Sequence, residues 1–133
     1  MIRAALAALL MASVPAAAQT IWQPLRPAEP ERVQGPEVAS GSTATLRALD
    51  KVSGAVEDLT LEIGQRGGYG RLAVELRACR YPVDNPASDA FAYLLIRDTV
   101  TDERLFEGWM FASAPALNAL DHARYDVWVL GCE

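Results

Sequence analysis

Apolar and polar residues alternate along two neighbouring stretches near the middle of the chain. In residues 58–63 and again in residues 71–78, every second side chain is apolar. A period of two is typical of a β-strand that has one face in the core and one in water. Four glycines fall in the connecting residues 64–70, which predicts a tight connection. The two stretches are therefore predicted to form a β-hairpin.

Four more strands are predicted from short runs of β-favouring residues. They cover residues 45–49, 91–96, 105–111 and 124–130. Residues 91–96 are apolar at every position, which is expected of a strand covered on both faces. Gly108 lies inside its predicted strand and marks a bulge or a close backbone approach. No internal repeat is recognised along the chain.

A short helix is predicted over residues 113–120. Ser113 can accept a hydrogen bond from the first free amides, and Pro115 is tolerated in a first turn. Leu117 and Leu120 are expected to turn inward. Six short strands and one short helix indicate a mainly all-β fold, a compact antiparallel barrel or sandwich.

The first 18 residues have the pattern of a secretory signal. Arg3 supplies a positive start, residues 4–14 form an apolar stretch, and residues 16–18 are three alanines. These small residues predict cleavage after Ala18, so that the mature chain begins at Gln19. The apolar run is shorter than the roughly 20 residues that span a bilayer, so a retained anchor is the weaker interpretation. Export places the protein in the oxidising periplasm.

Residues 19–42 are predicted to be a Pro-rich flexible leader, and residues 43–133 a single β-rich domain. Four prolines of the leader remove backbone donors and favour extended chain. Trp22 and Leu25 are apolar exceptions that could dock on the domain or on a partner. Two incidental apolar residues in a flexible leader are the simpler interpretation.

The charge balance argues against nucleic acid as a partner. The chain carries 12 basic and 17 acidic side chains. Without residues 1–18 it keeps 11 basic and 17 acidic ones, a net charge of −6. A mildly acidic surface repels phosphate backbones. No basic cluster indicates binding to anionic lipid, and no later segment is long and apolar enough to cross a membrane.

The two cysteines, Cys79 and Cys132, are predicted to form a structural disulfide. Their bond would close a loop of about 54 residues and contribute roughly 4 kcal/mol on the chain-entropy model. Thiol oxidoreductases usually need a close pair such as C-x-x-C. A zinc site needs four good ligands, and the chain has one histidine. Reactive or ligating thiols and pairing between molecules remain as minor alternatives.

His122 is the only histidine and the first candidate for chemistry. Asp121 precedes it and Asp126 lies nearby in sequence, so a carboxylate could orient the imidazole as a general base. Ser113 would then be the nucleophile, although no G-x-S-x-G elbow surrounds it. The simpler interpretation is that His122 ends the short helix and bonds its terminal carbonyls.

Other candidate sites have equally simple structural interpretations. Asp84, Asn85, Ser88 and Asp89 could hold calcium, but the spacing is not that of an EF-hand, and ordinary turn chemistry is favoured. The glycine-rich residues 67–70 lack the context of a phosphate-binding loop. No metal and no cofactor are expected.

Four aromatic residues lie in and near the last two strands. They could line a groove for a sugar or a peptide. Aromatics at strand spacing more often belong to the core, and one left exposed would mark a binding surface. Core positions are therefore predicted for most of Trp109, Phe111, Tyr125 and Trp128.

Several segments together resemble a family of small exported alphaproteobacterial proteins, catalogued as domain-of-unknown-function family twenty-one fifty-five. The resemblance spans residues 43–132 and implies export and a cysteine pair at Cys79 and Cys132. That family has no established function, so it implies no catalytic residue. Ala123 stands where a proline often follows the histidine. The segments that carry the resemblance are residues 49–54, residues 79–82 with Asn85 and Pro86, residues 106–110, and residues 113–122 running into 124–129.

The favoured hypothesis is a non-enzymatic periplasmic binding or scaffold protein whose partner is another envelope protein. A small periplasmic hydrolase built on Ser113, His122 and Asp121 or Asp126 is one alternative. It requires a serine oxygen within about 3.2 Å of a histidine nitrogen. A barrel for a small apolar ligand is the other, and it requires an internal cavity of about 300 Å³ or more.

Overall fold

The computed structural model describes residues 35–133. The expected signal segment 1–18 and the expected leader up to residue 34 lie outside the described residues. Eight strands and one 3-10 turn follow each other along the described chain: β1 (Val38–Ser40), β2 (Thr43–Asp50), β3 (Val56–Glu62), β4 (Arg66–Tyr69), β5 (Leu72–Pro82), β6 (Phe91–Asp98), β7 (Arg104–Phe111), η1 (Pro115–Leu117) and β8 (Tyr125–Cys132).

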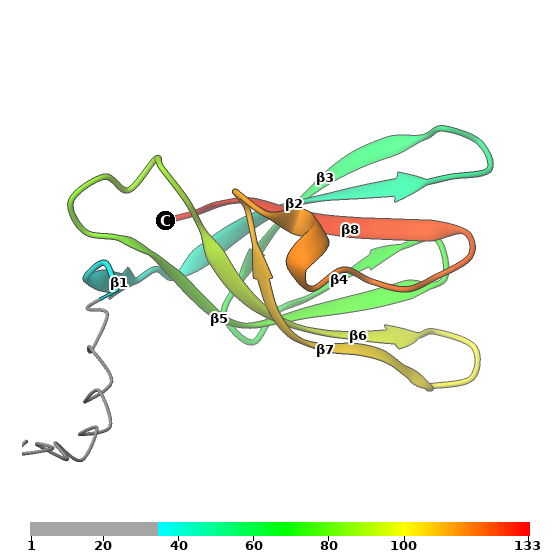
Figure 1. Cartoon of the computed structure of the whole chain (residues 1–133). Helices are drawn as coiled ribbons and strands as arrows, with labels where there is room; N and C mark the ends of the chain where they lie inside the picture. The colour runs from blue at the N-terminus through cyan, green and yellow to red at the C-terminus, as the bar shows by residue number, and fades with distance from the viewer. Residues whose placement is uncertain (1–34) are drawn as a thin grey trace, which may run out of the picture. The chain divides into compact units, whose positions relative to one another are not determined.

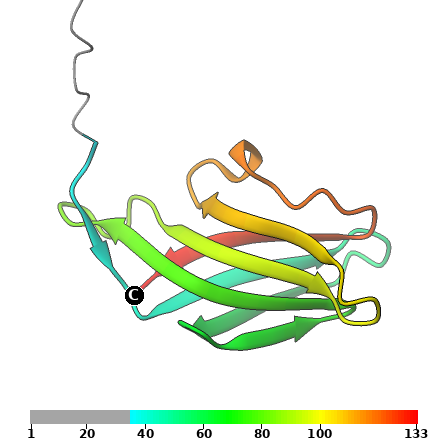
Figure 2. The ribbon, with the colours of Figure 1, turned by 90° about the horizontal axis from the view of Figure 1, so that it is seen from below.

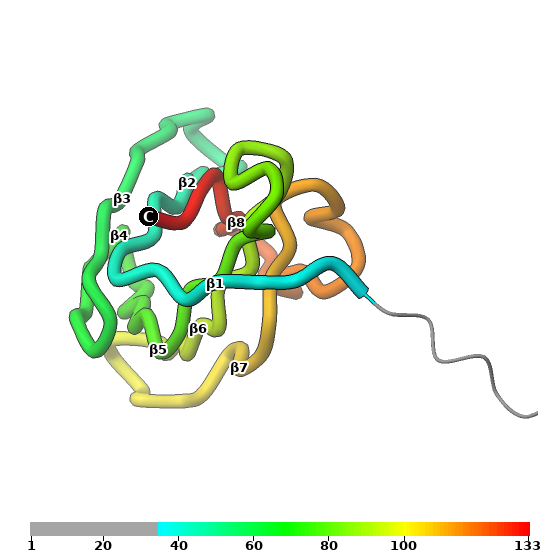
Figure 3. Tube along the Cα trace, turned by 90° about the vertical axis from the view of Figure 1, so that its left-hand side faces the viewer, coloured from blue at the N-terminus to red at the C-terminus, as the bar shows by residue number. Residues whose placement is uncertain are grey.

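The strands form two antiparallel sheets that pack face to face (Figure 1). The larger sheet has the order β1-β5-β6-β7, with β4 also paired to β5, and the smaller sheet has the order β3-β2-β8. Figure 3 looks along the strands and shows β2 and β8 in one layer and β5 and β6 in the other. The all-β prediction is confirmed, and the architecture is a sandwich rather than a closed barrel.

The core lies between the sheets because alternation turns one row of each strand inward. The inward-facing side chains of β2, β5, β6 and β8 are almost fully buried. These inward side chains form one buried hydrophobic cluster. The rows are Ala44, Leu46 and Ala48; Leu72, Val74 and Leu76; Ala92, Leu94 and Ile96; and Tyr125, Val127 and Val129.

The predicted hairpin between residues 58–63 and 71–78 is wrong. β3 pairs with β2, whereas β5 belongs to the other sheet. The chain leaves the smaller sheet at Gly64, and the glycine-rich segment then forms β4, which makes its own hairpin with β5. Gly70 closes that hairpin at φ +55°, where a Cβ would lie 2.6 Å from the Tyr125 hydroxyl. Glycine is therefore favoured at this position for two reasons: it adopts a positive φ without strain, and it has no Cβ to collide with the Tyr125 ring.

Two other expectations about local structure need correction. The end of the expected leader is ordered, because β1 pairs with residues 80–82 of β5. The expected helix 113–120 is a single 3-10 turn with no side-chain cap. Leu120 is buried as expected, but Leu117 is 74% exposed. Gly108 does mark a close approach: the Asn118 amide lies against it and donates to the Trp109 carbonyl at 2.9 Å.

A disulfide joins the two sheets. Cys79 near the end of β5 and Cys132 at the end of β8 have their Cα atoms 5.8 Å apart. Their side chains are 1% and 8% exposed, so the bond is shielded from solvent. Backbone hydrogen bonds reinforce this end of the sandwich, since Gly41 donates to the Cys79 carbonyl and Thr43 donates to the Glu133 carbonyl.

We predict that the double substitution Cys79→Ala/Cys132→Ala lowers the free energy of unfolding by about 4 kcal/mol, because the unfolded chain regains the entropy of a long open loop. Urea denaturation of the oxidised protein and of the double variant measures the difference. The wild-type protein in reductant should behave like the variant. An unchanged urea midpoint would show that the bond contributes nothing to stability.

Candidate functional site

The structure separates Ser113 from His122. The Ser113 hydroxyl donates to Asp89 Oδ2 at 2.7 Å, and the Ser113 amide donates to Asp89 Oδ1 at 2.9 Å. Burial by itself would raise the pKa of Asp89, but the hydrogen bonds from Ser113 and Ala90 lower it below its usual value. This serine therefore ties the loop after β7 to the loop before β6.

His122 supports the start of β8. Its Nδ1 atom accepts hydrogen bonds from the Arg124 amide at 3.1 Å and from the Tyr125 amide at 2.9 Å. The imidazole also stacks on the Tyr125 ring, with centroids 5.2 Å apart. Because Nδ1 accepts these two amides, this nitrogen is not free to take a proton from a serine hydroxyl. The expected hydrogen bonds from His122 to the last carbonyls of a helix are therefore wrong. The ring instead accepts hydrogen bonds from the amides where β8 begins.

The carboxylates on either side of His122 do not orient it. Asp126 accepts the amide of Val127 at 2.9 Å, and Asp121 is exposed. Among the described residues no hydrogen bond joins His122 to Asp121, Asp126 or Ser113. The geometry required for the hydrolase alternative is therefore not met.

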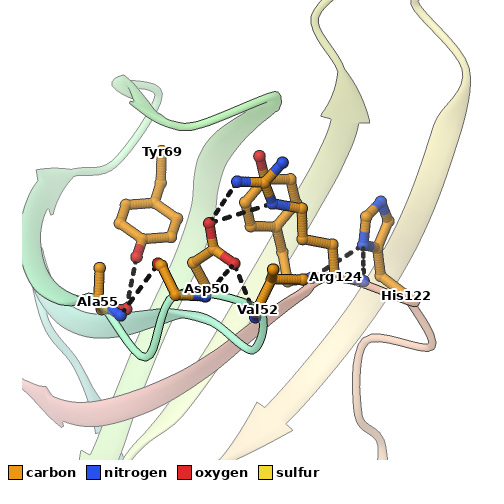
Figure 4. Close-up of polar contacts among 8 residues, drawn as sticks. Asp50, Val52, Ala55, Tyr69, His122 and Arg124 are labelled. Carbon is orange, nitrogen blue, oxygen red and sulfur yellow. Dashed lines mark hydrogen bonds and ion pairs between the residues drawn. The ribbon is translucent and has the colours of Figure 1, made fainter.

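Asp50 is the centre of a polar network at the end of β2 (Figure 4). Its Oδ2 atom accepts from Arg124 Nε at 3.0 Å and Nη2 at 2.7 Å. Its Oδ1 atom accepts from the amides of Val52 at 2.9 Å and Ser53 at 3.3 Å. The Lys51 amide donates to the Arg124 carbonyl. One carboxylate thus closes the turn between β2 and β3 and holds the start of β8.

Asp98 has an equivalent role in the larger sheet, where the turn after β6 meets the start of β5. We call each of these two places a corner. Its Oδ1 atom accepts from the amides of Val100 at 2.8 Å and Thr101 at 3.0 Å, and Arg71 Nη2 lies 2.9 Å from its Oδ2. The Thr99 amide donates to the Arg71 carbonyl. Asp50 and Asp98 are the two buried acidic residues of the described chain. Both corners share a short sequence, Asp-x-Val-Ser/Thr, in residues 50–53 and 98–101.

Both aspartates are held in their charged form. Hydrogen bonds from Arg124, followed in size by those from Val52 and Ser53, lower the pKa of Asp50 well below its usual range. The amides of Thr101 and Val100, helped by Arg71, lower the pKa of Asp98 to about 2. Burial opposes the shift at both sites. These carboxylates are structural acceptors and not proton donors at neutral pH.

The outer face of the larger sheet carries a cluster of aromatic side chains that we call the aromatic face: Phe91, Tyr93, Trp109 and Phe111. Figure 2 looks onto this side of the sheet, where β5, β6 and β7 run side by side. The register places Phe91 opposite Phe111 and Tyr93 opposite Trp109. The two pairs meet edge to face, with centroids 5.7 Å and 5.4 Å apart.

The aromatic face corrects two sequence expectations. Of the four aromatics assigned mostly to the core, Tyr125 is buried, whereas Trp109, Phe111 and Trp128 are only partly buried. The apolar run 91–96 is not covered on both faces by other elements, since Phe91 and Tyr93 point away from the core row of β6. Partly exposed aromatics of this kind are typical of contact surfaces.

Arg80 of β5 completes the aromatic face. Its guanidinium carbon lies 5.1 Å from the centroid of the Trp109 ring, within the range of a cation–π interaction. Arg80 also lies opposite Phe91 in the register. Pro36, Val38, Arg80, Phe91, Trp109 and Phe111 line a groove of about 330 Å³ at this end of the sheet.

A second groove, of about 510 Å³, lies beside Asp89, Ser113 and Cys132. Among its polar side chains, Asp89 and Ser113 already bond each other. Within residues 35–133 no group of three or more His, Cys, Asp or Glu side chains is placed to hold a metal ion. The same residues contain no helix with the length and apolar character needed to cross a membrane. The aromatic face is therefore the candidate functional site.

The comparisons with known proteins place the chain in a family without giving it an activity. The chain belongs to a family of uncharacterised proteins conserved in bacteria, DUF2155, whose model matches residues 44–132. It is similar to the uncharacterised protein RP359 of Rickettsia prowazekii (strain Madrid E), at 24% identity over 105 residues, which cover 77% of this chain and 68% of that protein. No solved structure matches. The resemblance predicted from the sequence is confirmed.

Some of these features do have a signal in the sequence that strand periodicity alone does not show. The Asp-x-Val-Ser/Thr segments at residues 50 and 98 are a short internal repeat, and each marks a corner. The unbroken apolar run 91–96 marks a strand whose outer face is also apolar. Nothing local distinguishes Arg80, because its place beside Trp109 comes from pairing of β5, β6 and β7.

We predict that stability falls as the pH drops below about 4, the ordinary pKa of aspartate. Both aspartates have lowered folded-state pKa values, so the stability they contribute is complete above the unfolded pKa and is lost as the pH falls toward the folded values. Thermal unfolding between pH 7 and pH 2 measures the effect. The variant Asp50→Asn/Asp98→Asn should be less stable at pH 7 and show a shallower acid dependence. Parallel pH profiles would contradict this.

We predict that His122→Phe lowers the free energy of unfolding by about 1 to 2 kcal/mol, because two amides lose their acceptor while the aromatic stack on Tyr125 is kept. Chemical denaturation measures it. His122→Ala removes the stack as well and should be less stable still. A His122→Phe protein as stable as the wild type would refute the capping role.

Proposed function

We propose that this protein is a non-enzymatic, exported binding protein of the bacterial cell envelope, and that it contacts an envelope protein through the aromatic face. The observation that carries the proposal is the aromatic face itself. Four partly exposed aromatic side chains and one arginine gather on one side of the larger sheet. Aromatic and arginine side chains are the residues most enriched among those that dominate binding energy at protein interfaces.

Export is supported by the shielded disulfide and by the signal pattern of residues 1–18. A bond between Cys79 and Cys132 persists in an oxidising compartment and is rare in the cytosol. Binding rather than catalysis is supported by the occupied hydrogen-bonding groups of Ser113 and His122. Binding of a partner protein requires only that the folded domain hold the contacting side chains in place.

The rigidity of the surface also supports the proposal. The aromatic face lies on paired strands, and their inward neighbours Ala92, Leu94 and Met110 are at most 2% exposed. A surface on such a scaffold binds without ordering new structure, so little conformational entropy is lost. The outer side of the smaller sheet carries Trp128 at an equivalent outward position, opposite Arg47. Trp128 therefore offers a matched control on the other side of the molecule.

Photo-crosslinking in living cells tests this function. A benzophenone amino acid replaces Phe111 in one variant and Trp128 in another, and both are expressed as full-length chains in the native host. We predict a light-dependent adduct of discrete mass with an envelope protein from position 111, and none from position 128.

Adding Trp109→Ala to the position-111 variant should reduce that adduct severalfold. The level of protein and the oxidised state of its cysteines serve as controls for folding. Equal adducts from both positions, or no adduct from either, would refute the proposed contact surface.

A further inference from the structure

Arg80 has a charge that no carboxylate of the described residues neutralises. Residues 35–133 contain eight arginines, and each of the other seven forms an ion pair. Two carboxylates share the outer face of the larger sheet with Arg80. Arg66 and Arg77 engage Glu75, and Arg104 engages Glu107. Among residues 35–133, Arg80 is therefore the one arginine of this face without an ion pair, and its guanidinium carbon lies 5.1 Å from the Trp109 ring centroid.

The walls of the groove restrict what can occupy it. Apart from the Arg80 guanidinium, the lining side chains are hydrocarbon or aromatic: Pro36, Val38, Phe91, Trp109 and Phe111. A sugar would bring several hydroxyls into the groove, and each would need a hydrogen-bond partner or lose free energy on leaving water. The lining suits an occupant that is mainly apolar and carries one anionic group.

Proline fits these walls especially well. A proline residue has no amide hydrogen, so it can be buried without an unsatisfied donor, and its ring packs on aromatic side chains. Proline-containing segments adopt an extended helix before binding, which lowers the entropy lost in aromatic grooves. Pro36 of this chain already forms one wall of the groove, beside Val38 and the aromatic side chains.

We propose, on the basis of the proposed function, that the occupant of the groove is an extended, acidic, proline-containing segment of a partner protein. A side-chain carboxylate of that segment forms a charge-assisted pair with Arg80. One or more proline rings pack against Trp109 and Phe111. The partner is thereby defined by two features at short spacing, an aspartate or glutamate and a proline.

Selection from a random 12-residue peptide library displayed on phage tests the proposal. The target is the purified, oxidised protein. We expect the selected peptides to share a proline within a few residues of an acidic residue. A synthetic peptide of the selected consensus should bind in fluorescence anisotropy. Replacing its acidic residue by the amide, or its proline by alanine, should weaken binding roughly tenfold each.

Matched variants of the protein locate the binding. Arg80→Gln and Trp109→Ala should each weaken binding of the consensus peptide about tenfold or more. Arg97→Gln, an arginine on the same face that pairs with Asp102, and Trp128→Ala on the other sheet should leave it unchanged. Unfolding midpoints of all four variants establish that each is folded at the assay temperature.

Three outcomes would overturn the inference. These are selection of no peptide, selection of peptides without the acidic and proline features, and binding of soluble envelope glycan fragments at the groove in place of peptides. Apolar peptides that depend on Trp109 but not on Arg80 would leave the proposed function standing while refuting the acidic partner. A failure of the position-111 crosslink as well would refute both.

Discussion

The carboxylates of Asp50 and Asp98 fix the geometry of both sheets. Each one accepts the amides of a hairpin turn and the guanidinium of an arginine at the start of a third strand. A buried carboxylate without these partners would be costly, whereas with them it sets three strands in one register. Figure 1 shows both turns at the same end of the sandwich. Each aspartate holds strands of its own sheet together at that end, and the disulfide joins the two sheets near the other end.

The filled space between the two sheets explains why the aromatic face stays exposed. The interior is already filled by the inward rows of β2, β5, β6 and β8, so Phe91, Tyr93, Trp109 and Phe111 have no room there. They shield one another edge to face instead. The sheet that carries them is stabilised by its buried inner side, and its outer side keeps these aromatic side chains partly exposed. In the proposed function, recognition and stability thus use opposite faces of the same strands.

The sequence predicts which residues form strands better than it predicts which strands pair. Period-two alternation identifies the buried side of residues 58–63 and 71–78, but it contains no information on the partner strand. The glycines of residues 64–70 suggested a turn and hid β4, because the open conformational space of glycine permits both. The prolines before residue 37 similarly hid β1, a three-residue edge strand, and proline is compatible with edges.

The candidate site was only partly predictable for a similar reason. Trp109 and Phe111 of the aromatic face are aromatic candidates in the sequence, whereas Phe91 and Tyr93 belong to a run predicted to be covered on both faces. Exposure depends on how many layers cover a sheet, which is a property of the whole fold. Ser113 and His122 were sensible candidates by residue type. Their hydrogen bonds to Asp89 and to the amides of β8 come from loops that no local pattern predicts. Fold class follows from periodicity, whereas site geometry follows from contacts between distant segments.

The covalent link through Cys132 also governs how two copies of the chain can meet. β8 is the last strand and pairs with β2 alone, so in the reduced chain only hydrogen bonds and packing prevent it from inserting into a neighbouring molecule. Exchange of such terminal strands is a common route to intertwined dimers. Once the sulfur atoms are joined, β8 is tied to its own β5 and that exchange is closed. A chain that forms this bond before it meets another copy is therefore protected from that exchange.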